Sequence, residues 1–474
     1  MESFSLLYRL NRAFFLCGIA LYLIIFFYWL NSVNIYNLLS MIVFFSYTYL
    51  LWMCINKDES FFTSRRLWIT VSVYSFIFVS LYLLMSYYYT GNTFLFSELD
   101  ARVYEKMSYR LVDIPISEMT NYLSKHRWSF DDWGAPISMA LILKIIPSKL
   151  FLNFCYIIIN AFSALMLFDV GKMLGMTKKY SYMAALAFSL SSYSIFFMGA
   201  FLKEEIFVFL VIASFWMLYK YCTTSLFVYL LGGGLTSLLI IFFRVPVAIF
   251  IWLAYAIRLI TSDNGLLKKS LFLMLCIIVG LMSVSLIIYS ADNYANGGNI
   301  GSSYDFIHTT LFEKIVSTAG AFVGPFPSMF QITTNVDITG KALYGTGVLY
   351  KLLLFFPFWK GIVYCVRSRC KDLYPLYIFC ILEIIGLALS LEGLELRKAM
   401  PHVPLFILVA FWYMYKFDSD TTELVRSSSY YYWTYRSFTA SMLVVFIITL
   451  AWNTIIRTEH LEHIYIQLTP LFTT

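Results

Sequence analysis

Residues 205–261 read EIFVFLVIASFWMLYKYCTTSLFVYLLGGGLTSLLIIFFRVPVAIFIWLAYAIRLIT, and this stretch decides the class of fold. Only four of its residues are charged: Glu205, Lys220, Arg244 and Arg258. Charges and short polar segments divide it into three apolar runs, at 205–221, 225–243 and 245–261. A helix that crosses a bilayer needs about 20 mostly apolar residues. The stretch therefore predicts three successive membrane-spanning helices.

The whole chain has the same character. Its 474 residues are 60% hydrophobic and 13% charged, with a mean hydropathy of +0.75. Soluble domains are about 25% charged, so this chain has too little polar surface to cover a water-soluble globule. The composition excludes a disordered chain, a collagen, a nucleic-acid-binding domain and a secreted disulfide scaffold. It predicts an all-α bundle of transmembrane helices.

The net charge of +7 does not indicate a nucleic-acid partner. Basic residues collect in cytoplasmic loops of membrane proteins, and no basic stripe here carries interleaved exposed aromatic residues. The eight cysteines have no zinc-type pairing and are absent from the two longest polar segments. Disulfides are therefore not expected to hold the fold.

Apolar runs along the chain predict 13 spans in total. They lie at 12–31, 35–54, 67–90, 150–171, 180–198, 205–221, 225–243, 245–261, 270–290, 347–365, 374–391, 402–416 and 437–456. The first run, with an apolar core at 14–30, is too long for a signal-peptide core and lacks a small-residue cleavage site. We interpret it as a retained signal anchor.

The run at 135–146 is too short and too interrupted to assign from hydropathy alone. If it does not span, one side of the membrane receives 18 basic residues in short segments. The short loops of the other side then carry only Lys203, Arg244, Arg397 and Lys398. The positive-inside rule selects this arrangement, with the N-terminus in the cytoplasm and the C-terminus outside. The run at 135–146 is then a re-entrant or interfacial helix.

This topology divides the chain into five parts: 1–90 with three spans, a first outer loop at 91–149, central spans at 150–290, a second outer loop at 291–346, and C-terminal spans at 347–474. A helix is expected at 99–111 within the first loop. Loops of this length usually carry function. The expected location is the cytoplasmic (inner) membrane, as a multi-pass protein.

Clustered charges in the short outer loops are candidates for a site, because charge near membrane depth is costly. The clusters are Lys203-Glu204-Glu205, Arg244, and a group formed by Glu392, Glu395, Arg397 and Lys398. Ordinary explanations stay open for each. The two glutamates could cap a helix, Lys203 could snorkel, Arg244 could break a helical hairpin, and Arg397 with Lys398 could anchor the chain at the interface.

Acids at both ends of the first loop are stronger candidates for a functional site. Glu98 and Asp100 open the loop, with Tyr104 one helical turn later, and Asp131-Asp132 close it. One acid could act as a general base while another orients the substrate or holds a metal ion. The alternative is a solvated loop with ordinary acids. No histidine pair has zinc-ligand spacing, and the chain has no Walker A motif, no GxGxxG before a helix and no nucleophile elbow.

Five segments, together with a helix break at Arg244, resemble the GT-C type integral-membrane glycosyltransferases, which use lipid-linked sugars. The segments are ELDARVYEKMS (98–108), DDWGAPIS (131–138), MLGMTKKYSYMAALAFSLS (173–191), GAFLKEEIFVFLVI (199–212) and LRKAMPHVPLFILVAF (396–411). The similarity lies in an acid four residues before an aromatic, a Lys-Glu pair opening a middle helix, and an arginine shortly before a proline in a late helix.

The resemblance implies an inverting transfer of sugar from a polyprenyl phosphate to a glycan or lipid-linked acceptor, in cell-surface polysaccharide synthesis. It implies Asp100, with Glu98, as the catalytic acids, and Lys203, Arg244, Arg397 and Lys398 as ligands of the donor phosphate. The residues that it implies to orient the acceptor are Tyr104, Asp131, Asp132, Glu204 and Glu205. A divalent cation, if one is used, would bind among the same acids.

Two other functions stay open. An O-antigen or capsule repeat-unit polymerase has similar length and loops, but is expected to rely on arginines in the outer loops, and 291–346 contains none. A flippase or transporter of lipid-linked oligosaccharides needs charge lining a path through the bilayer. Glu383 and Asp169 are the obvious intramembrane acids. A charge cluster at the membrane surface favours transfer, and one at the midplane favours transport.

Overall fold

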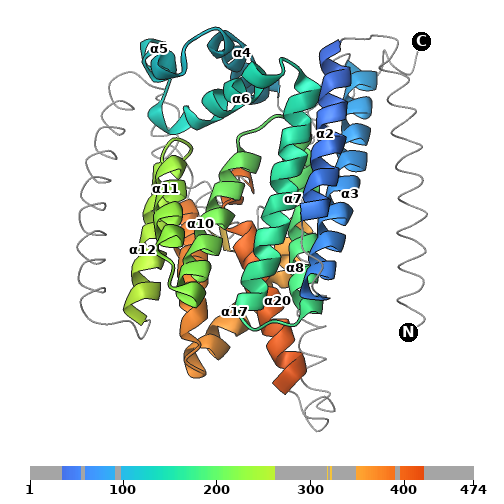
Figure 1. Ribbon diagram of the computed structural model, residues 1–474. Coiled ribbons are helices and arrows are strands. Elements are labelled where there is room, and N and C mark those ends of the chain that lie inside the picture. Colours follow the sequence, from blue (N-terminus) through green and yellow to red (C-terminus); the bar gives the residue numbers. More distant parts are fainter. Residues whose placement is uncertain are drawn as a thin grey trace, which may run out of the picture.

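The computed structural model describes residues 35–54, 59–90, 98–126, 128–261, 318, 321–322, 348–389 and 396–420 (Figure 1). Throughout these residues the secondary structure is helical, with short loops and turns and no β-strand. The predicted spans at 12–31, 270–290 and 437–456, including the proposed signal anchor, lie outside this description. So does most of the second predicted loop.

Long helices form where the apolar runs predicted them. They are α2 (Ile35–Cys54), α3 (Glu59–Thr90), α7 (Lys149–Met173), α10 (Glu204–Thr224), α11 (Phe227–Ile240), α12 (Val245–Thr261), α17 (Val348–Arg367), α18 (Tyr374–Leu389) and α20 (Val403–Asp420). Four segments are long and apolar enough to cross a membrane: 65–83 within α3, α7, α10, and 371–389 around α18. The protein is therefore a helical membrane protein.

The predicted span at 180–198 is two helices in the structure. The axes of α8 (Lys178–Ser189) and α9 (Ser192–Gly199) differ by 42°, so the pair is either a broken span or a re-entrant segment. Serine hydroxyls compete with helical backbone bonds at the break. Ser189 Oγ donates to the Ala185 carbonyl at 2.7 Å, and Ser194 Oγ donates to the Phe188 carbonyl at 3.1 Å.

The predicted span at 225–243 is also shorter in the structure. Helix α11 ends at Ile240, where the backbone bonds tighten: the amides of Phe242 and Phe243 donate to carbonyls three residues back, at 3.2 and 2.9 Å. Its 14 residues extend about 21 Å, less than the roughly 30 Å of hydrocarbon in a bilayer. Its outer face is nevertheless apolar and exposed, including Phe227, Leu231 and Leu235, as expected of a helix in contact with lipid.

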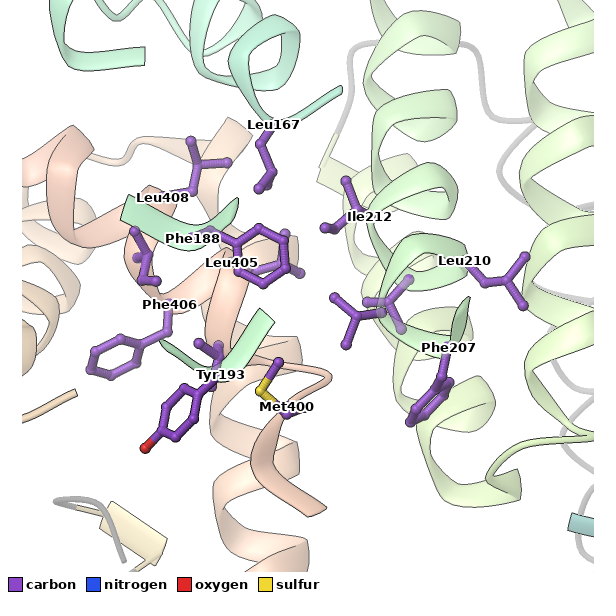
Figure 2. Packing of buried hydrophobic residues seen from close by; sticks show 14 of the residues in the cluster. Leu167, Phe188, Tyr193, Phe207, Leu210, Ile212, Met400, Leu405, Phe406 and Leu408 are labelled. Carbon is purple, nitrogen blue, oxygen red and sulfur yellow. The ribbon is translucent and has the colours of Figure 1, made fainter. Parts of the chain in front are cut away.

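The side chains of the bundle form one continuous apolar core. Figure 2 shows Leu167 of α7, Phe188 of α8, Ile212 of α10 and Leu405 of α20 gathered in it. Beside them, the Phe358 ring of α17 stacks on Phe406 of α20, with centroids 4.1 Å apart. Aromatic pairs of this kind add about 0.5–1.5 kcal/mol beyond the burial of their area. The core holds the ends of these helices in fixed relative positions.

A helical layer, the cap (98–126 and 128–146), lies across one end of the bundle (Figure 1). It consists of α4 (Glu98–Val112), η1 (Ile116–Glu118), α5 (Met119–Lys125), η2 (Phe130–Asp132) and α6 (Gly134–Ile145). It has a small core of its own, formed by Met107, Leu111, Met119, Leu123 and Ala140. The helix predicted at 99–111 is confirmed as α4.

Helix α6 is the run that hydropathy alone could not assign. Its 12 residues extend about 18 Å, too short to cross a bilayer, and it packs on α4 and α7. Lys144 Nζ donates to the Ile114 carbonyl at 2.9 Å and also to the Val112 carbonyl, and so ties α6 to the end of α4. The structure thus shows a short helix at 135–146, and its place relative to the membrane stays a prediction.

Candidate functional site

The predicted site residues meet where the cap touches the bundle. Lys203 is only 6% exposed, and its ammonium forms an ion pair with the Asp132 carboxylate. The Tyr104 hydroxyl donates to the same carboxylate oxygen at 3.2 Å. Asp132 therefore joins α4 of the cap to Lys203, the residue immediately before α10 in the bundle. The sequence named all three residues but not their contact.

Local sequence explains how Tyr104 and Asp132 reach this position. Ala101, Tyr104, Ser108 and Leu111 are buried, and their spacing of three or four residues places them on one face of α4. Asp132 ends the short helix η2. Its neighbour Asp131 accepts a hydrogen bond from the Ser129 hydroxyl inside the same turn. The two adjacent acids thus make different contacts.

Arg244 lies in the turn between α11 and α12 and connects a third region to the site. Its Nη1 donates to the Lys398 carbonyl at 2.7 Å, and its guanidinium carbon lies 5.8 Å from the Phe207 ring centre. The Phe207 ring is nearly parallel to Phe243, with centroids 5.9 Å apart. Lys203 Nζ also donates to the Phe243 carbonyl at 3.4 Å. The turn between α11 and α12 therefore contacts Lys203 through the Phe243 carbonyl and also contains Arg244.

The cap is anchored to that same turn. The Gly134 amide donates to the Phe242 carbonyl at 2.8 Å. A Cβ atom on Gly134 would lie 2.5 Å from the Phe243 ring, closer than side chains approach one another. Glycine is therefore required for this approach of backbone to ring. The contact holds Asp132, two residues earlier, over Lys203.

Glu204 and Glu205 begin α10 and are almost completely buried, at 1% and 2% exposure. Negative charge in the first turn of a helix is favourable, which agrees with the capping interpretation. Capping alone does not require burial, because a capping acid can stay in water. Two buried acids therefore follow the buried Lys203 directly in the sequence.

Three predicted residues are placed only by their backbone. Glu98 and Asp100 lie in the first turn of α4, and Arg397 lies in α19 (Leu396–Ala399); their side chains are outside the described part of the structure. Asp100 precedes Tyr104 by four residues, about 6 Å along the helix axis. The Lys398 carbonyl accepts a hydrogen bond from Arg244.

Three further ionisable groups are buried in the bundle, and only one of them was expected as an intramembrane acid. Lys351 of α17, Glu383 of α18 and His402 are buried. Lys351 Nζ donates to the Ala321 carbonyl at 2.8 Å, and Cys380, one turn from Glu383, contacts the His402 carbonyl at 3.8 Å. Glu383 was expected as an intramembrane acid. Lys351 was missed, although the apolar run 347–365 contains two lysines, Lys351 and Lys360, and a lysine in such a run is a usable signal.

The other predicted intramembrane acid lies at the opposite end of the bundle. Asp169 forms an ion pair with Lys220 at 2.9 Å and accepts a hydrogen bond from Trp216 Nε1 at 3.0 Å. Among the described residues, no three His, Cys, Asp or Glu side chains come together as metal ligands. A site for a divalent cation made by these residues alone is therefore not formed in the described part.

Fold and site together define a helical membrane protein with a polar site between a helical cap and the end of its bundle. No protein-family model matches the chain, and comparison with curated proteins found no match.

Proposed function

We propose that the protein is a membrane glycosyltransferase that moves a sugar from a polyprenyl-phosphate donor to a glycan or lipid-linked acceptor. The observation that supports this most directly is the network of Tyr104, Asp132, Lys203 and Arg244 beneath the cap. A lipid-linked donor keeps its tail in the bilayer and its phosphate near the interface. A polar site at the end of a spanning bundle suits such a substrate.

The cations are placed to stabilise a leaving phosphate. A lysine ammonium has three N–H groups. In Lys203, one N–H group donates to Asp132 and a second donates to the Phe243 carbonyl. The third N–H group is left for a phosphate oxygen. One N–H group of Arg244 donates to the Lys398 carbonyl, and its planar guanidinium has further N–H donors. Positive groups aimed at developing negative charge are worth about 2.7–4 kcal/mol in related cases.

The reaction then needs a base. In the proposal Asp100 accepts the proton of the acceptor hydroxyl, whose oxygen attacks the anomeric carbon. The bond from that carbon to the phosphate oxygen breaks, and the phosphate leaves with the electron pair, so the configuration inverts. Glu98 supports Asp100. Arg397 and Lys398 add positive charge, and Tyr104, Asp131, Glu204 and Glu205 orient the acceptor. Asp132 positions Lys203.

A donor assay tests this function. The purified chain in liposomes, supplied with polyprenyl-linked sugars and glycan acceptors, should transfer sugar. Arg244→Gln should lower the rate by about 10- to 100-fold, because one charge-assisted hydrogen bond and one phosphate contact are lost. Arg367→Gln, at the far end of α17, is the matched control and should keep the parent rate. No transfer from any polyprenyl-linked sugar, or full activity in Arg244→Gln, would contradict the proposal.

The proposal also includes the 13-span topology, with the cap outside the cytoplasmic membrane and the N-terminus inside. An odd number of spans puts the two termini on opposite sides. A reporter fused to the C-terminus should therefore be active outside the cytoplasm, while one fused to the N-terminus should report the cytoplasm. Both reporters on the same side would contradict the span count.

Two alternative functions use the same site differently. A repeat-unit polymerase would transfer whole oligosaccharides, and the product size in the donor assay distinguishes it. A flippase or transporter is favoured by one specific observation, the buried Lys351, Glu383 and His402. Charged groups inside a bundle often mark a path across the membrane. Movement of a lipid-linked sugar between leaflets without bond formation would select that alternative.

A further inference from the structure

The end of the bundle opposite the cap carries a second cluster of charge, which the proposed transfer does not use. Two segments far apart in sequence form it: 172–180, at the turn from α7 to α8, and 412–416 of α20. Trp412 Nε1 donates to the Leu174 carbonyl at 3.2 Å, and the rings of Tyr180 and Tyr415 lie 5.8 Å apart. These contacts bring Lys172, Lys178, Lys179 and Lys416 to one region; we refer to them as the lysine cluster.

Three members of the lysine cluster lie close to aromatic rings. Lys179 Nζ is 5.8 Å from the Tyr180 ring centre. Lys416 Nζ is 5.6 Å from Tyr415 and 6.0 Å from Trp412, and Lys172 Nζ is 6.0 Å from Phe168. Lysines among tyrosine and tryptophan rings are typical of the membrane interface, where lipid headgroups begin. The lysine cluster is therefore at headgroup level by its own composition.

The positive charge of the lysine cluster is not balanced within the described side chains. None of its four members forms an ion pair there, and Asp169 is already paired with Lys220. Lys178 and Lys179 occupy the first turn of α8, where positive charge opposes the helix dipole. Helix stability therefore does not explain these lysines, and a bound anion would give them a partner of opposite charge.

We propose that the lysine cluster binds the phosphate groups of an anionic phospholipid, with the lipid tails along the Tyr180 and Tyr415 side of the bundle. Basic pockets between transmembrane helices bind phosphate-rich headgroups in this way. Four lysines from two segments match a headgroup with two phosphates better than one with a single phosphate. Such a lipid would link the α7–α8 turn to α20. The inference does not depend on the proposed sugar transfer.

Lipid titration of the full-length chain tests the inference. The protein in neutral detergent micelles is titrated with diphosphatidylglycerol, and bound lipid is counted by native mass spectrometry. The double variant Lys179→Gln/Lys416→Gln should bind about 25-fold more weakly, at about fivefold for each lysine. Lys179→Arg/Lys416→Arg should bind like the parent. Arg367→Gln/Lys371→Gln, at the same end of the bundle but outside the lysine cluster, is the control and should also bind like the parent.

Further arms of the titration identify the source of the phosphate. Phosphatidylcholine should not compete for the site, and inorganic pyrophosphate should compete only weakly, because it lacks the tails. Equal binding of lipid by the glutamine variant and the parent would overturn the proposal. Pyrophosphate binding as tight as that of the lipid would assign the site to a soluble phosphate and also overturn it. Equal unfolding temperatures of variant and parent in lipid-free detergent show that the fold is intact.

Discussion

Lys203→Met should lower sugar transfer by about 10³-fold, the largest effect expected at any single cation. The substitution removes a phosphate ligand and leaves the Asp132 carboxylate without its ammonium. Breaking a fully buried pair costs about 3–5 kcal/mol. The cost here is smaller, because the Asp132 side chain is 35% exposed and water can reach it. Initial transfer rates and the free energy of unfolding in detergent measure the two effects.

A second ion pair in the same chain provides a matched control. Lys220 pairs with Asp169 at the end of the bundle away from the cap, so Lys220→Met should leave the transfer rate within about twofold of the parent. The double variant Lys203→Met/Asp132→Leu separates the effect on the free energy of unfolding from the effect on the transfer rate. Removing both partners of a pair restores stability more readily than removing one. Recovery of stability without activity supports the phosphate role, whereas recovery of full activity would contradict it.

Asp100→Asn should lower the turnover of sugar transfer by about 10²- to 10⁴-fold, the usual contribution of a general base. The amide has nearly the same shape but cannot accept the proton of the acceptor hydroxyl. The Michaelis constant for the lipid-linked donor should change little, because the donor phosphate binds the cations. Steady-state kinetics with donor and acceptor varied separately give both values.

Asp113→Asn is the control for that substitution, since Asp113 follows α4 in an exposed turn and should tolerate the change. The fold of the cap in Asp100→Asn can be checked by limited proteolysis, which should match the parent. Full activity in Asp100→Asn would remove Asp100 as the base. Activity lost equally in both asparagine variants would indicate a general loss of acidic charge.

The sequence by itself determined the helical class and the positions of most helices. Runs such as 35–54 and 245–261 coincide with α2 and α12, because an apolar run in a bilayer must satisfy its backbone hydrogen bonds within its own helix. The helix expected at 99–111 likewise coincides with α4. Hydropathy and periodicity are properties of neighbouring residues, so no tertiary information was needed.

The positions at which helices break or end early were harder to predict from the sequence. The break at 189–192 depends on where serine hydroxyls bond, and the early end of α11 depends on the turn that holds Arg244. Both segments are apolar enough to look continuous. Composition was therefore a poor guide where side-chain hydrogen bonds compete with the helix.

Only the tertiary structure decided which charges meet. Asp132 pairs with Lys203 across 71 residues of sequence, and Arg244 reaches Lys398 across 154. The sequence marked these residues as unusual because charge near a membrane is costly, but cost alone does not choose a partner. The partner is chosen when helices pack and their ends come to lie side by side. The same packing buries Lys351 beside α18 and gathers Lys172 and Lys416 at the opposite end.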